Sequence, residues 1–251
     1  MKFNKKKSIF ILSIFAFLVF LIAKNSNNSK LPDSKHQIYL YGELHGEKEI
    51  MDREFEIWSD YYKNYGFRHL FIEESYAGAA FLNMWMKEDD DRILDFIYDN
   101  LKGTLAHNPY YKKHFKKIKE NCPETIFHGT DVDHQYMTTG NAYLRYLRNN
   151  GKLDSYEYKI CKENNNQGFK FYMENDDDYR ENMMVKNFVR EYEKFDDKRI
   201  MGIYGGYHLG LNLKDPNSNA PPMAIQLKEK YGDIIYTENL YDPNSLDSNR
   251  N

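Results

Sequence analysis

Residues 37–46 read Gln37-Ile38-Tyr39-Leu40-Tyr41-Gly42-Glu43-Leu44-His45-Gly46. An apolar, β-prone run ends in a glycine, and a carboxylate and an imidazole follow two residues apart. The glycines on both sides of Glu43-Leu44-His45 allow the backbone to turn sharply and bring other groups close. Because open α/β sheets bind ligands at the carboxyl ends of their parallel strands, this stretch predicts a buried strand that delivers Glu43 and His45 to a site.

A second stretch has the same design. Residues 199–208 read Arg199-Ile200-Met201-Gly202-Ile203-Tyr204-Gly205-Gly206-Tyr207-His208, an apolar run that ends in glycines and a histidine. Parallel strands place such ends on one edge of a sheet. We therefore expect His45 and His208 to face one another across one cleft, with the rest of the chain holding the two stretches together.

The remaining pattern predicts an α/β fold with a central, mainly parallel sheet flanked by helices. Residues 47–65 carry apolar side chains at helical spacing and end before Gly66, a usual residue after a helix end. The charged segment 77–119 predicts a helical excursion over the strand-end site, and the polar, Asn-rich segment 152–178 predicts helix only in part. Further strands are expected at 67–72, 125–131 and 233–237, and further helices at 139–149, 178–195 and 223–231.

The composition limits the kinds of partner. A formal net charge of −3 argues against a general nucleic-acid binder, because no cationic surplus exists to displace counterions from phosphates. The two cysteines, Cys122 and Cys161, do not have the spacing of a metal-binding pair, and the sequence leaves open whether they form a disulfide. We expect the ligand to be a small molecule or a peptide; the oligomeric state is not readable from the sequence.

The amino terminus resembles an export signal. Four lysines among the first seven residues precede an uncharged, strongly apolar run at 8–23. A helix over this run would be about 24 Å long, shorter than a hydrocarbon core of ~30 Å, so its length does not separate a cleaved signal peptide from an anchor. Without a clear cleavage site we favour an uncleaved anchor at 1–24, with the domain outside the cytoplasm, or secreted if the segment is cleaved. A linker (25–36), one catalytic-like domain (37–241) and a disordered tail (242–251) are expected to follow.

Six polar side chains are the candidates for chemistry, and five of them stand at or just after predicted strand ends. Histidine titrates near neutrality, so it can accept a proton from water or bind a metal through a neutral nitrogen. Histidines and carboxylates together also suit a divalent metal, and an arginine can stabilise a developing oxyanion. The candidates are Glu43, His45, Glu73, Asp131, Arg180 and His208.

Each candidate also has a purely structural interpretation. Glu43 can cap the following helix, and either histidine can be a hydrogen-bonded structural residue. Glu73 can pair with Arg68, while its neighbour Glu74 is expected to be solvated. Asp131 can close an Asx turn, and Arg180 can belong to a surface cluster with the aspartates at 176–178. Of the other histidines, only His134 is a reserve ligand.

Five short motifs occur in the order found in the Tiki/TraB/ChaN superfamily, which includes erythromycin esterase-like proteins and haem-binding ChaN-like domains. The segment 42–46 resembles its first Gly-x-x-His motif, and the segment 205–208 resembles the second. The resemblance extends from about Ile38 to Tyr236. The intervening matches are Phe71-Ile72-Glu73, Gly129-Thr130-Asp131 and the helix segment Arg180-Glu181-Asn182-Met183-Met184-Val185-Lys186-Asn187.

This resemblance implies a strand-end active site on a central parallel sheet, in which histidine and glutamate activate water. It leads us to expect a membrane-anchored hydrolase of ester or amide bonds. His45 would be the general base, Glu43 would orient it, and Arg180 would stabilise negative charge. Glu73 and His208 would complete the site, directly or through a divalent metal ion (Mn²⁺, Zn²⁺ or Co²⁺) whose ligands would come from Glu43, His45, Glu73, His208 and Asp131.

Two alternatives remain open from the sequence. One is a ChaN-like protein that binds haem or a metal without turnover, for which aromatic residues such as Tyr204 and Tyr207 would suit a flat ligand. The other is an interaction domain that keeps the fold without the chemistry. The sequence does not identify the substrate, because the middle helical region that shapes the pocket is particular to this chain.

Overall fold

The structure, a computed structural model, describes residue 31 and residues 35–196, 198–211 and 218–241. All of these except Leu31 belong to one compact unit, Pro32–Asn251. The predicted anchor, most of the predicted linker and the predicted tail lie outside the described residues. No helix within the described ranges combines the length and the apolar character needed to cross a membrane.

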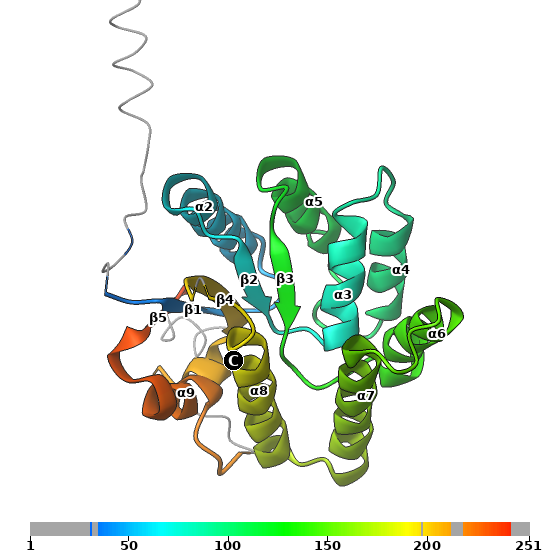
Figure 1. The fold of residues 1–251 in the computed structure, drawn as a ribbon. Helices are drawn as coiled ribbons and strands as arrows, with labels where there is room; N and C mark the ends of the chain where they lie inside the picture. The colour runs from blue at the N-terminus through cyan, green and yellow to red at the C-terminus, as the bar shows by residue number, and fades with distance from the viewer. Residues whose placement is uncertain (1–30, 32–34, 197, 212–217, 242–251) are drawn as a thin grey trace, which may run out of the picture. The chain divides into compact units, whose positions relative to one another are not determined.

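One sheet organises the described part of the chain. Its five strands are all parallel and lie in the order β3-β2-β4-β1-β5 (Figure 1), which confirms the predicted α/β class. β4 pairs with β1 on one side and β2 on the other, so that Gly205 lies opposite Glu43 and Ile203 lies opposite Ile72. The strands are β1 (Ile38–Glu43), β2 (His69–Ile72), β3 (Ile126–Gly129), β4 (Ile200–Gly205) and β5 (Ile235–Asn239).

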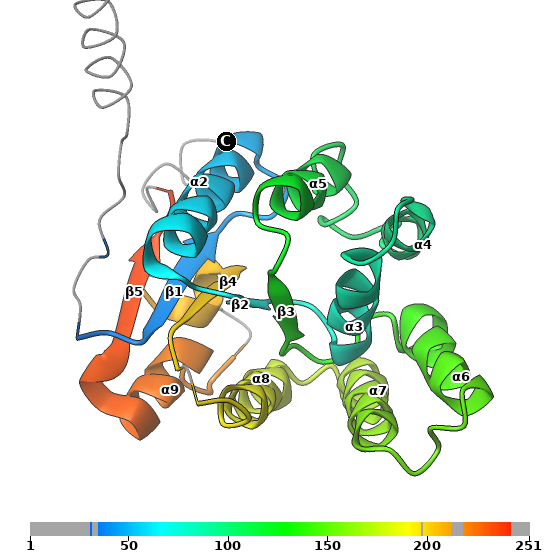
Figure 2. The same cartoon turned by 45° about the horizontal axis from the view of Figure 1, so that its top comes forward.

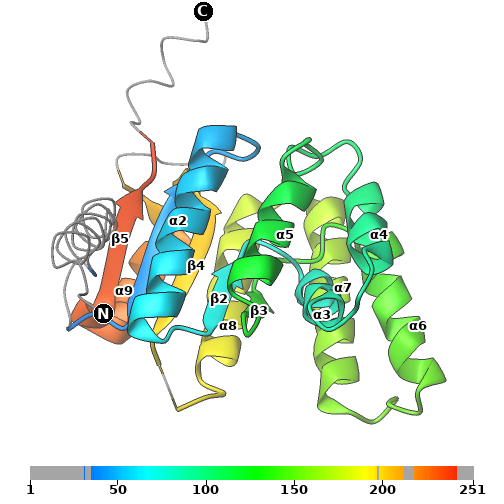
Figure 3. The same ribbon diagram turned by 90° about the horizontal axis from the view of Figure 1, so that it is seen from above.

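Helices cover both faces of this sheet (Figures 2 and 3). α2 and α5 lie over one face, α8 and α9 over the other, and α3, α4, α6 and α7 are grouped beyond β3. The α-helices are α2 (Lys48–Tyr65), α3 (Tyr76–Trp85), α4 (Arg92–Asn100), α5 (Tyr111–Asn121), α6 (Asn141–Asn149), α7 (Tyr156–Glu174), α8 (Asp177–Tyr192) and α9 (Met223–Tyr231). A π-helical turn, η1 (Tyr136–Gly140), and two 3₁₀ turns, η2 (Gly206–Leu209) and η3 (Gly232–Ile234), complete the set.

The alternation of side chains along β1 explains how both faces become buried. Ile38 and Leu40 join a core cluster that includes Met184 of α8 and Leu227 of α9. Tyr39 and Tyr41 alternate with them and point to the opposite face, where the Tyr39 ring packs edge-on against Tyr61 of α2 at a centroid distance of 5.4 Å. Each fully buried side chain of this kind contributes roughly 1.5–3 kcal/mol of transfer free energy. A strand buried on both faces therefore places its polar residues at its end.

Two segments that the sequence described only coarsely are resolved into defined helices. The excursion at 77–119 forms three helices, α3 to α5, with the last two joined by the loop 101–110. The polar segment 152–178, expected to be helical only in part, contains the continuous helix α7. Its polar residues Asn164 and Gln167 are buried and hydrogen-bonded, which is why an apolar helical stripe is missing from the sequence. Cys122 and Cys161 are both buried free thiols.

Candidate functional site

The ends of β1 and β4 bring the two predicted motifs together. Glu43 is the last residue of β1, and Gly46 closes the following turn with a φ of +83°, a conformation that favours glycine. Gly205 ends β4, and a Cβ placed on it would lie 3.2 Å from Nε2 of His45. Because Gly205 has no side chain, the His45 ring has room to pack beside the end of β4.

His45 lies between two glutamates. Its Nδ1 is 2.9 Å from Oε1 of Glu43, and its Nε2 is 3.6 Å from Oε1 of Glu73. The Glu73 charge is the largest influence on the imidazole; it outweighs the opposing effect of burial and raises the pKa of His45 from 6.5 to about 11. The predicted contact between Glu43 and His45 is therefore present, and at neutral pH the ring carries a proton.

His208 has the same arrangement on the other side of Glu73. Its Nδ1 is hydrogen-bonded to Oε1 of Glu181, and its Nε2 lies 3.3 Å from Oε1 of Glu73. Glu181 is itself held by the backbone N–H of Met223, which donates to its Oε2 over 2.7 Å. Burial alone lowers the pKa of the His208 imidazole, but the charge of Glu73 and the bond to Glu181 outweigh it and raise the pKa to about 10.

Glu73 is the centre of this network. Its Oε2 accepts a hydrogen bond of 2.6 Å from the backbone N–H of Gly205, and its Oε1 faces both imidazoles. Burial raises the pKa of the Glu73 carboxyl, but the charges of His208 and His45 outweigh it and hold that pKa well below 4.5. The side chains alternate Glu43, His45, Glu73, His208, Glu181, so each imidazole lies between two carboxylates.

Arg180 joins this network to a third strand end. Its Nη2 donates to Oε1 of Glu73 over 2.7 Å and to Oδ2 of Asp131 over 2.6 Å, while its Nε donates to Oδ1 of Asp131 over 3.1 Å. Asp131 also accepts from Nε2 of His134 at 2.9 Å. Burial raises the pKa of the Asp131 carboxyl, but the charge of Arg180 outweighs it and the pKa lies below its ordinary value. The surface role considered for Arg180 is therefore wrong, as is the Glu73–Arg68 pair, since Arg68 binds Glu124.

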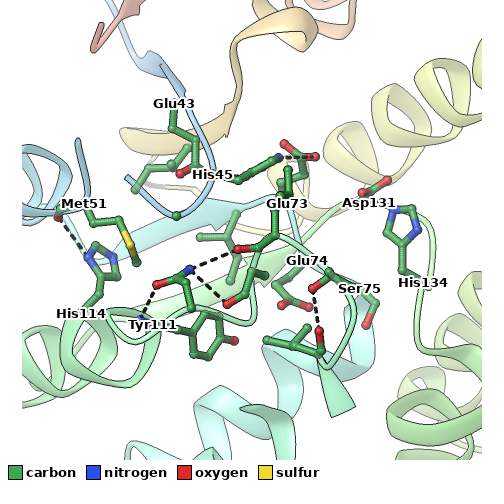
Figure 4. A pocket seen from close by; sticks show the side chains of 18 of the residues that line it. Glu43, His45, Met51, Glu73, Glu74, Ser75, Tyr111, His114, Asp131 and His134 are labelled. Atoms are coloured by element: carbon green, nitrogen blue, oxygen red, sulfur yellow. Dashed lines mark hydrogen bonds and ion pairs between the residues drawn. The ribbon is translucent and has the colours of Figure 1, made fainter. Parts of the chain in front are cut away.

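A cavity of about 320 Å³ opens beside these side chains (Figure 4). It lies at the lower end of the range of roughly 300–1,000 Å³ found for small-molecule sites. Its lining comes from the ends of β1 and β2, the residues after β3, the loop 101–110 and the inner sides of α2 and α5, so part of the predicted excursion covers the site. Of the six sequence candidates, the cavity is lined by Glu43, His45, Glu73, Asp131 and Arg180. His208 lies behind Glu73, outside the lining.

The cavity also contains groups that the sequence did not single out as functional. Glu74 was expected to be solvated, but it lines the cavity, and burial raises the pKa of its carboxyl from 4.5 to about 7. Glu54 of α2 and Tyr111 of α5 line the same space and are almost fully buried. The sequence signal for Glu74 is its position one residue after Glu73, at a predicted strand end. Nothing in the helical pattern indicates a functional role for Glu54 or Tyr111.

The aromatic residues considered for a flat ligand lie elsewhere. Tyr204 is fully buried in the core beneath the sheet, and its hydroxyl is 2.7 Å from Oγ1 of Thr130. Tyr207 is exposed, and neither tyrosine lines the cavity. The haem-binding alternative therefore gains no support from these two residues and stays a prediction.

The donor types suit a divalent metal, but their arrangement does not form a ready metal site. Within the described ranges, no group of three or more histidine, cysteine, aspartate and glutamate side chains is placed to hold a metal ion. The guanidinium of Arg180 also lies 2.7 Å from Oε1 of Glu73, the atom that both imidazoles face. A cation bound there would compete with this guanidinium for the same oxygen. The predicted ligand set stays a prediction that elemental analysis of the purified protein can test.

Comparison with known proteins adds no independent assignment, because no protein-family model, curated protein or solved structure matches the chain.

Proposed function

We propose that the protein hydrolyses an ester or amide bond of a small molecule or short peptide in the cavity at the ends of β1 and β2. The observation that carries this proposal is the convergence on Glu73: its Oε1 lies 2.7 Å from Arg180, 3.3 Å from His208 and 3.6 Å from His45. A buried anion that orders three positively charged groups at the wall of a cavity is a preorganised electrostatic site.

The raised pKa of His45 changes the role expected for it. A ring with a pKa of about 11 is protonated at neutral pH, so it cannot begin the reaction as the base that takes a proton from water. In the proposed reaction, His45 instead donates its proton to the leaving oxygen or nitrogen. Glu43 and Glu73 orient the ring for this transfer through its two nitrogens.

Glu74 supplies the base in this proposal. Its carboxyl lines the cavity and has a pKa of about 7, close to the pH at which the reaction would run. A water molecule would lose a proton to Glu74 while its oxygen bonds to the carbonyl carbon of the substrate. The tetrahedral intermediate would then break the bond to the leaving group, which takes the proton of His45.

Arg180 is placed to stabilise the oxyanion of that intermediate. Its hydrogen bonds to Glu73 and Asp131 use Nε and Nη2, and among the described residues no partner is bonded to Nη1. Arg180 lines the cavity, so this remaining donor can serve a substrate oxygen. A preorganised donor of this kind typically contributes about 10²–10³-fold in rate. His208 positions Glu73 from behind and does not touch the substrate.

The proposal includes the cellular location of the enzyme. The basic and apolar segment at 1–24 supports a membrane-anchored enzyme whose domain lies outside the cytoplasm.

The test is a screen of the full-length protein against chromogenic esters, amides, lactones and peptides, with chelator and with added Mn²⁺ or Zn²⁺. His45→Gln should lower turnover by about 10²–10⁴-fold. His36→Gln is the matched control, because His36 precedes β1 whereas His45 follows it. Glu74→Gln should abolish the rise in turnover through about pH 7. Equal turnover by the parent and His45→Gln would overturn the proposal.

A further inference from the structure

One wall of the cavity has chemistry that the proposed reaction does not use. It is formed by α2 and α5, on the side of the sheet away from α8 and α9 (Figure 2). Its apolar side chains are Met51, Phe115 and Ile118, and Leu70 of β2 continues the same surface. We call this the α2–α5 wall; it also contains Glu54, Tyr111 and His114.

Two polar atoms in the α2–α5 wall are buried without a hydrogen-bond partner in the described part of the chain. They are Oε1 of Glu54 and the hydroxyl oxygen of Tyr111. The residues are only 3% and 5% exposed, so bulk water does not replace the missing partners. A buried polar atom left unpaired costs about 1–3 kcal/mol, which is a reason to expect a ligand group at such a position.

The basic groups around Glu54 and Glu74 are histidines. Neither Glu54 nor Glu74 forms an ion pair with any lysine or arginine that the structure describes. Nε2 of His114 is 3.8 Å from Oε2 of Glu54. The other ring nitrogen of His114 is 3.1 Å from the backbone carbonyl of Met51. In Figure 4 the Tyr111 ring extends toward the carboxyl group of Glu74, the base of the proposed reaction, so the wall lies beside the reacting groups.

We propose that the α2–α5 wall binds the ammonium group of a short aliphatic or arylalkyl amine. This amine is part of the substrate, and its recognition determines which substrates the protein accepts. An ammonium carries three N–H donors and a positive charge, so it can pair with the unpartnered atoms of Glu54 and Tyr111. An alcohol has one donor and no charge, and a carboxylate would be repelled by the same oxygens. The apolar side chains of the wall take the hydrocarbon part of the amine.

The size of the cavity limits this amine. A space of about 320 Å³ must hold the amine and the scissile bond beside His45, so a short hydrocarbon spacer fits better than a long chain. The interpretation of the amine-binding wall as a substrate subsite rests on the proposed function. Amine binding itself can be measured without turnover, which keeps the two proposals separable.

The test compares n-hexylamine, n-hexanol and n-hexanoate, which share one hydrocarbon chain and differ only in the polar group. Isothermal titration calorimetry of the full-length protein at pH 7 should show saturable binding of hexylamine, about tenfold or more tighter than hexanol, with no binding of hexanoate. Equal affinity for hexylamine and hexanol would overturn the inference, and so would the absence of saturable amine binding.

Variants localise the binding. Glu54→Gln and Tyr111→Phe should each weaken hexylamine binding by about tenfold, because each removes an acceptor or the charge it provides. Glu56→Gln is the matched control, since Glu56 is an exposed acid of the same helix. Circular dichroism checks that both variants fold. If Glu54→Gln does not fold, Tyr111→Phe still tests amine binding at the wall. Unchanged amine affinity in a folded variant contradicts the inference.

His45→Gln separates the two proposals. It should keep parental hexylamine affinity while losing hydrolysis. Loss of hydrolysis with intact amine binding supports both proposals, whereas intact hydrolysis with absent amine binding removes only the inference.

Discussion

Oε1 of Glu73 lies 3.3 Å from Nε2 of His208, although the two residues stand at the ends of different strands and are far apart in the sequence. The contact exists because β2 and β4 are parallel neighbours whose carboxyl ends meet at one edge of the sheet. His45 reaches the same oxygen from β1, the other neighbour of β4. Glu73 therefore controls the protonation of both imidazoles.

Glu73→Gln should lower the pKa values of both histidines. In the parent, the ring-proton resonances of His45 and His208 should not titrate between about pH 6 and 8.5, because their pKa values are about 11 and about 10. Removing the Glu73 charge should move both toward 6.5, into the accessible range. NMR titration of histidine-labelled protein measures this. Unchanged titration of both rings in the variant would show that Glu73 does not hold their protons.

Arg180→Gln should destabilise the protein strongly. The substitution leaves Asp131 and Glu73, both buried, without their shared cation. Breaking a buried ion pair by removing one partner costs about 3–5 kcal/mol. Urea unfolding at pH 7 measures the loss.

Two comparisons make the Arg180 prediction specific. Arg148→Gln on the exposed side of α6 should stay within about 0.5 kcal/mol of the parent. Adding Asp131→Asn to Arg180→Gln should recover part of the loss, because one of the two buried carboxylates that lost the guanidinium is then neutral. A loss below about 1 kcal/mol for Arg180→Gln alone would contradict the buried bridge.

Gly205→Ala should lower both turnover and stability. The added methyl group would lie 3.2 Å from Nε2 of His45 and 3.3 Å from Oε2 of Glu73, so it presses on the two side chains whose spacing matters most. Gly205 has a φ of −52°, so alanine introduces no backbone strain. We expect a destabilisation of about 1–3 kcal/mol and a fall in turnover of about tenfold or more. Parental turnover in a folded Gly205→Ala protein would show that this spacing is not critical.

Glu54→Gln should make the protein more stable at neutral pH. Burial raises the pKa of Glu54 well above 4.5, so folding penalises its ionised form. For an acid with a raised native pKa, the parent has its full stability below pH 4.5 and loses stability as the pH rises toward the native value. The variant should therefore exceed the parent in free energy of unfolding at pH 7, and the difference should shrink below pH 4.5.

Urea unfolding between about pH 4 and 8 measures the Glu54 effect. Glu56→Gln provides the baseline for an exposed carboxyl of α2. A pH dependence of stability that is the same in Glu54→Gln as in the parent would contradict the prediction. A more stable variant with weaker amine binding would show that the buried acid is kept for its ligand.

Parts of the site could be predicted from the sequence because strand ends are easy to read. An apolar run followed by glycine and a polar residue marks the end of a buried strand, and parallel strands bring such ends together. This reasoning placed Glu43, His45, Glu73 and His208 at one edge of the sheet before their contacts were known. Their catalytic or metal-binding roles stay predictions.

The rest of the site could not be predicted because helical residues reveal burial only through apolar periodicity. Glu54 resembles any acid on the polar side of an amphipathic helix, yet it lines a cavity together with residues of α5. The segment 152–178 is polar and Asn-rich, yet Asn164 of its helix donates to the backbone carbonyl of Asp131 over 2.8 Å. Contacts of this kind between distant helices leave no local pattern in a sequence.

The central position of β4 in the sheet affects how the chain folds during its synthesis on the ribosome. β1 and β2 emerge early, but neither is the other's neighbour, because β4 fills the position between them. A nascent chain that has not reached Ile200 has no partner for the inner edges of these strands, so their unpaired backbone groups remain open to other chains. Completion of the sheet and assembly of the Glu73 network therefore depend on the same late segment, and a chain truncated before β4 should be a substrate for chaperones or proteases.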